Sequence, residues 1–144
     1  MPNWCTNNLI VEGKEQDVKK FVEDVKVEKS PLSFAKLVPV PDEIPRHPSP
    51  QYLSDEELNW RISNWGTKWD VNTYEDDEDM QFDLNEISNG IFEAVYTFDT
   101  AWTPCNKWLR EVAPMYPNLK FVLEYTEEGM GIADIEIFNF KDED

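Results

Sequence analysis

Apolar positions alternate with polar ones in several short runs of this chain, a pattern that predicts β-strands with one buried face. In the first run Leu9 and Val11 alternate with Asn8, Ile10 and Glu12, and Gly13 ends it. Two further alternating runs flank Asn89-Gly90, which is the strongest short-range signal for a β-hairpin. The complete set of predicted strands covers residues 7–12, 33–38, 69–74, 80–85, 92–98, 119–125 and 130–140.

Three other segments show the spacing of amphipathic helices. The first spans about 14–26 and places Val18, Phe21, Val22 and Val25 on one face. The second opens with Ser54 as N-cap and Glu57 as its capping-box partner, and Gly66 ends it in a left-handed conformation. Its apolar stripe is Leu58, Ile62 and Trp65.

The third helix is predicted to begin at Thr103 as N-cap, with Pro104 at its first position. Its buried side would be Trp108, Leu109, Val112 and Met115, and Pro117 prevents continuation.

This order of elements predicts an α+β fold with a ferredoxin-like β-α-β / β-α-β core and a mainly antiparallel sheet. A connector with five prolines covers residues 39–53, and the acidic run 75–79 is expected to be a loop. We therefore predict one domain over residues 1–144, with a helix-containing insertion at about 39–80 and an extra C-terminal hairpin strand.

The net charge of −17 narrows the range of partners. Residues 51–100 carry thirteen acidic and only two basic side chains. Such a surface repels phosphate, which argues against direct binding to DNA, RNA or anionic lipid and favours basic partners or a purely solubilising role. Without a signal peptide or apolar span, and with Cys5 and Cys105 as free thiols, the sequence predicts a cytoplasmic protein that does not bind membranes.

The heptapeptide Asn64–Asp70 is the most distinctive segment, because two tryptophans four residues apart flank a glycine and a lysine. One hypothesis is a groove that binds a partner protein, in which tryptophan rings supply contact area and charged side chains supply orientation. Its residues would be Trp65, Thr67, Lys68, Trp69, Asp70 and Trp102. The alternative is a packed corner, with Trp65 in the helix stripe and Trp69 at the start of a strand. The groove hypothesis predicts that alanine at Lys68 and Asp70 abolishes binding with little change in melting temperature.

The sequence offers no catalytic or metal-binding arrangement. The single histidine, His47, lies in the proline-rich connector, and Cys105 near a helix start has no identifiable base beside it. The acidic run lacks the spacing of a calcium loop, and no glycine-rich phosphate loop is present. We therefore expect no cofactor, no metal and no catalytic residues.

Three motifs resemble a known family. Residues 1–9 with Gly13, then Asn64–Asp70, then Trp102-Thr103-Pro104, are similar in kind and order to the YubB-like ferredoxin-like proteins. The stretch from Tyr125 to Gly131 resembles that family's closing hairpin, whereas Cys105 stands where a second proline is expected. The resemblance implies a ferredoxin-like fold and an origin in bacteriophages, plasmids or other mobile elements, and it implies no activity.

Three hypotheses for function follow. The first is a non-catalytic protein-interaction module that uses the aromatic groove. The second is an acidic nucleic-acid mimic that inhibits a DNA-binding protein, which requires an ordered array of carboxylates. The third is a cryptic hydrolase, which requires a closed pocket converging on His47 or Cys105. An RNA-binding sheet is excluded by the negative field, and the oligomeric state cannot be read from the sequence.

Overall fold

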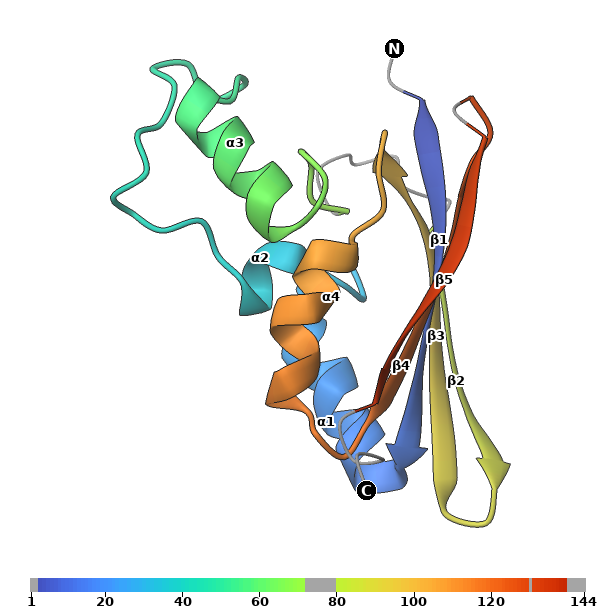
Figure 1. Ribbon diagram of the computed structural model, residues 1–144. Coiled ribbons are helices and arrows are strands. Elements are labelled where there is room, and N and C mark those ends of the chain that lie inside the picture. Colours follow the sequence, from blue (N-terminus) through green and yellow to red (C-terminus); the bar gives the residue numbers. More distant parts are fainter. Residues whose placement is uncertain (1–2, 72–79, 130, 140–144) are drawn as a thin grey trace.

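A five-stranded antiparallel sheet forms the frame of this computed structural model, which describes residues 3–71, 80–129 and 131–139 (Figure 1). The strand order is β2-β3-β1-β4-β5. Two split β-α-β units, β1-α1-β2 and β3-α4-β4, interleave to give this order, which confirms the predicted ferredoxin-like core. The strands are β1 (Trp4–Lys14), β2 (Gln81–Ser88), β3 (Ile91–Ala101), β4 (Lys120–Glu127) and β5 (Ile132–Asn139).

The helices lie on one face of the sheet, and within the described residues the opposite face carries no helix (Figure 1). They are α1 (Glu15–Val25), α2 (Phe34–Leu37), α3 (Asp55–Asn64), α4 (Asn106–Val112) and the 3-10 turn η1 (Ala113–Met115). The core lies between the layers. Helix α1 contributes Val18, Phe21 and Val25 from the predicted face, and β1 contributes Leu9 and Val11.

Both predicted hairpins are present. Gly90 turns β2 into β3 with a φ of 80°, as the Asn-Gly signal indicates. Strand β5 pairs antiparallel with β4 and is the extra C-terminal strand. The chain between α1 and β2, residues 26–80, contains the helices α2 and α3.

The prediction of a strand at residues 33–38 is wrong. Phe34–Leu37 form the short helix α2 instead. The carboxylate of Asp70 accepts hydrogen bonds from the backbone N–H groups of Phe34 (2.8 Å) and Ala35 (3.0 Å). A partner more than thirty residues away therefore satisfies the first donors of the helix, which overrides the local preference.

The predicted strand at 69–74 is not formed over Trp69–Val71, and residues 72–74 lie outside the described part of the chain, as does the predicted acidic loop 75–79. Helix α4 begins at Asn106 rather than after Thr103, because the Thr103 hydroxyl donates to the carbonyl of Gly66 instead of capping the helix. Met115 is exposed, whereas Trp108, Leu109 and Val112 are buried as predicted.

Helix α3 begins as predicted and packs differently. Ser54 Oγ accepts from the N–H of Glu57 at 3.0 Å, so the N-cap is confirmed. The Glu57 carboxylate pairs with Arg61 at 2.8 Å, and Glu57 is buried. Ile62, predicted in the apolar stripe, is exposed, and Trp60 packs against the core instead.

Candidate functional site

The heptapeptide Asn64–Asp70 joins the end of α3 to the loop between β3 and α4. Gly66, with a φ of 91°, ends α3 by donating to the carbonyl of Ile62, which confirms its predicted left-handed role. The carbonyl of Trp65 then accepts from Trp108 N–H at 3.2 Å. The Thr67 hydroxyl donates to the carbonyl of Ala101 at 3.0 Å. Two motifs that are more than thirty residues apart in sequence thus form one hydrogen-bonded unit.

Trp65 and Thr67 are core residues of this unit, each 1% exposed. The indole of Trp65 donates to the carbonyl of Val38 at 2.9 Å and packs against Phe34 with ring centroids 5.8 Å apart. Trp108 donates in the same way to the carbonyl of Phe34 at 3.1 Å. The two buried indoles therefore satisfy their N–H groups by holding α2, which is a structural role and leaves neither ring available to a partner.

Asp70 likewise stabilises the fold through its hydrogen bonds. Besides its two bonds to α2, its carboxylate accepts from the Ser33 hydroxyl at 2.9 Å and from the Val71 N–H at 2.7 Å. Of the six predicted site residues, Trp65, Thr67 and Asp70 thus build the corner, as the alternative hypothesis proposed for Trp65.

The other three residues, Lys68, Trp69 and Trp102, lie at the surface, where a fourth residue joins them. Trp4 is 43% exposed, and its ring centroid lies 6.1 Å from that of Trp69. The Lys68 ammonium lies 4.3 Å from the centroid of the Trp69 ring. We call Trp4, Lys68, Trp69 and Trp102 the aromatic surface. Sequence reasoning did not select Trp4 as a site residue, because only the register of β1 on β3, which pairs Trp4 with Ala101, brings it here.

Trp102 is held in a strained conformation. Its φ is 69°, and Thr103 N–H donates across it to the carbonyl of Ala101 at 2.8 Å, which forms a γ-turn. A bulky side chain at positive φ is an outlier among folded proteins. Two hydrogen bonds fix this turn, one from Trp102 N–H to the Asn3 carbonyl (2.8 Å) and one from the Thr100 hydroxyl to the Thr103 carbonyl (2.6 Å). The ring nevertheless remains 41% exposed, so the strain does not serve core packing.

A groove of about 330 Å³ adjoins the aromatic surface and shares Trp69 with it. It runs between the proline-rich connector and the heptapeptide. Its lining is Ser33, Ala35, Pro50, Gln51, Tyr52, Leu53, Arg61, Trp65, Trp69 and Asp70.

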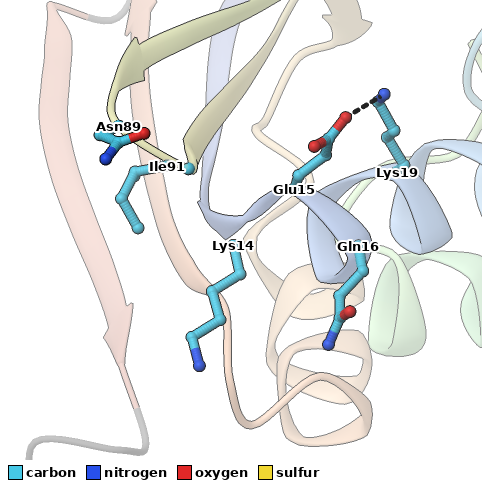
Figure 2. A pocket seen from close by; sticks show the side chains of 7 residues that line it. Lys14, Glu15, Gln16, Lys19, Asn89 and Ile91 are labelled. Atoms are coloured by element: carbon cyan, nitrogen blue, oxygen red, sulfur yellow. Dashed lines mark hydrogen bonds and ion pairs between the residues drawn. The ribbon is translucent and has the colours of Figure 1, made fainter.

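A second hollow, at the opposite end of the sheet, lies between the β2–β3 hairpin and the start of α1 (Figure 2). Glu15 and Lys19 pair with each other on one side of it, whereas the Lys14 and Gln16 side chains extend away from that pair. None of its seven lining residues is a histidine, cysteine or serine, and its one carboxylate, Glu15, is paired with Lys19.

The residues considered for catalysis do not meet in one pocket. His47 is exposed on the connector, where its Nδ1 accepts from Ser49 N–H at 2.9 Å. Cys105 is fully buried. Among the described residues no group of three or more His, Cys, Asp or Glu side chains is placed to hold a metal ion.

Burial disfavours the reactive thiolate form of both cysteines. It raises the pKa of Cys5 to about 11, with a smaller opposing effect from the hydrogen bond to Thr100, and it raises the pKa of Cys105 further. Since the thiolate is the reactive form, we expect the native protein at about pH 8 to resist an aromatic disulfide reagent. The chain unfolded in denaturant should release two equivalents of the reagent's thiol. Rapid labelling of the native protein would contradict this expectation.

One family model matches part of this chain. Residues 65–135 match the family model described as the ferredoxin-like domain in Api92-like protein. The match supports the ferredoxin-like fold of the chain, although it does not include β1 and α1 of that core. The match begins at Trp65 and ends within β5, so it contains the surface residues Lys68, Trp69 and Trp102. No curated protein matches the chain, and no solved structure does. Within the described residues, no helix has the length and apolar character needed to cross a membrane.

Proposed function

We propose that this chain is a non-catalytic interaction module that binds a partner protein through the aromatic surface. The observation that carries the proposal is Trp102, whose exposed ring extends from a strained turn that two hydrogen bonds fix, one of them to the carbonyl of Asn3. Backbone strain persists where the surrounding structure enforces it, and such positions cluster at binding sites. Exposed tryptophans are also the residue type most enriched where interfaces gain their affinity.

The charge of the chain indicates the chemistry of the partner. A net charge of −17 attracts a basic protein over distances of about one Debye length, roughly 8 Å at physiological ionic strength. The aromatic surface would then provide the short-range contacts, with Lys68 covering Trp69 until a partner side chain replaces it. Binding of this kind should persist at high salt, because buried aromatic area is not screened.

The test is an affinity capture from bacterial lysate at low and high salt, identified by mass spectrometry. We expect a partner that is retained at high salt by the native chain and lost with Trp102→Ala or Lys68→Ala. Met115→Ala, which removes an exposed apolar side chain outside both the aromatic surface and the groove, is the matched control and should retain the partner. A partner lost equally with all three variants, or one released from the native chain by salt alone, would contradict the proposal.

The acidic nucleic-acid mimic remains the second candidate on the strength of the net charge alone. Its densest run of carboxylates, residues 75–79, lies outside the described part of the chain. A DNA-binding enzyme that is captured at low salt and released as salt rises would favour the mimic.

We further propose that residues 1–144 form one domain with an insertion at about 39–80, and that the protein works in the cytoplasm. The single sheet formed by all five strands supports the first statement, and the two free, buried cysteines support the second. The resemblance to YubB-like proteins supports an origin in bacteriophages, plasmids or other mobile elements.

A further inference from the structure

The uncovered face of the sheet carries a continuous apolar row. Side chains directly opposite each other in an antiparallel pair share a face, and the alternate positions of each strand point toward the helices. Leu9 and Val11 of β1 are buried beneath the helices, so Ile10 points outward. The register extends this outward position across four strands as Val95, Ile10, Val122 and Ile137.

The edge strand leaves the end of this row open to solvent. Ile137 is 60% exposed, and Ile135, two positions away on the same face of β5, is 53% exposed. Ile10, Val95 and Val122 are half-buried by their neighbours in the sheet. Every helix lies on the other face, so no element of the described chain covers the row (Figure 1).

The face, rather than the strand edge, is the accessible surface. On β5 the side chains that point toward the helices include Asp134 and Glu136, since these pair with Tyr125 and Leu123. Inward-pointing charges are a known device that blocks pairing of an added strand at an edge. The outward isoleucines have no such protection.

The rim of the row is mainly acidic. Around this apolar row, the outward positions of β1, β2, β3 and β4 carry five carboxylates. The same positions carry only two ammonium groups, those of Lys14 and Lys120. The carboxylates belong to Glu12, Asp83, Glu93, Asp99 and Glu124. An apolar row with such a rim is complementary to an apolar stripe bordered by lysine or arginine.

We propose that this face binds an amphipathic helix of a partner protein, with an apolar stripe flanked by basic residues. The row crosses three strand spacings, about 14 Å. Two turns of an α-helix span about 11 Å and place apolar side chains at i, i+3 or i+4, and i+7, so such a stripe matches the row in length. A second copy of this chain is the less suitable occupant, because a two-fold contact would place the acidic rim against itself.

This surface is distinct from the aromatic surface, so the two proposals can fail separately. The probe is a fluorescently labelled 18-residue peptide of leucine and lysine, with leucine at helical spacing, measured by anisotropy at physiological salt. A leucine and glutamate peptide with the same spacing is the charge control. The face variant is Ile135→Thr/Ile137→Thr, which keeps β-branched residues at exposed strand positions and should not disturb folding. Met115→Thr replaces an exposed apolar residue on the helical layer and is the matched control.

We expect the lysine peptide to bind, the glutamate peptide not to bind, and the face variant to weaken binding about tenfold, as loss of a few buried methyl groups predicts. Met115→Thr and Trp102→Ala should leave the affinity unchanged. Equal binding by the face variant would show that charge alone attracts the peptide and would overturn the proposal. Concentration-dependent dimerisation of the native chain that disappears in the face variant would also overturn it, in favour of a second copy.

Discussion

Gly66→Ala is expected to destabilise the protein by about 3 kcal/mol, whereas Gly90→Ala should cost only about 1 kcal/mol. Both glycines have positive φ, at 91° and 80°, so both variants carry the same backbone penalty. The difference lies in the space around them. A Cβ at Gly66 would lie 2.6 Å from the carbonyl oxygen of Pro104 and 3.1 Å from Asn106 Oδ1, whereas at Gly90 it would meet nothing within 4 Å.

Denaturant unfolding of the two variants measures this difference, and Gly90→Ala controls for the conformational cost. The close approach at Gly66 belongs to the unit that joins the heptapeptide to the β3–α4 loop. Equal losses in the two variants would mean that this loop moves away at little cost, and that the unit is less rigid than its hydrogen bonds indicate.

Asp70→Ala is expected to cost about 3 kcal/mol, because the backbone donors of Phe34 and Ala35 and the hydroxyl of Ser33 lose a charged acceptor together. Asp55→Ala is the matched control, since it removes the same charge from the exposed first turn of α3 and should cost about 0.5 kcal/mol. Thermal unfolding of both variants gives the comparison.

The structural role of Asp70 changes the mutagenesis test of the groove hypothesis. Alanine at both Lys68 and Asp70 was expected to abolish binding without affecting stability, but the structure places Asp70 beneath α2. Lys68→Ala alone is the clean test of recognition. If Asp70→Ala melts like the native chain and yet loses its partner, Asp70 belongs to the recognition surface after all.

The sequence was sufficient wherever local chemistry decides the conformation. Asn89-Gly90 specified a hairpin, Gly66 a left-handed helix end, and Val18, Phe21 and Val25 a buried helix face, each through a preference that acts within a few residues. These signals, together with the order of the runs, were enough to predict the ferredoxin-like core.

The sequence-based predictions were wrong where a residue distant in sequence determines the local conformation. Residues 33–38 were predicted as a strand, yet Asp70, Trp65 and Trp108 hold this segment as a helix from positions that no local pattern reveals. Thr103 has the sequence of an N-cap and instead donates to Gly66. For the same reason, the six predicted site residues separate into buried residues and surface residues. The spacing of Trp65 and Trp69 is equally compatible with a groove and a packed corner, and only the tertiary arrangement assigns one ring to the core and the other to the surface.

The bond from the Trp65 indole to the Val38 carbonyl has a consequence for the segment between them. It joins the residues that flank segment 39–64, Val38 and Trp65, within the core. The two ends of this segment are therefore held together whatever its length. The entropy of closing a loop grows only with the logarithm of its length, so doubling the connector would cost about 0.6 kcal/mol. A longer connector would therefore reshape one wall of the groove beside Trp69 at little cost in stability, while the sheet and both of its faces stay as they are.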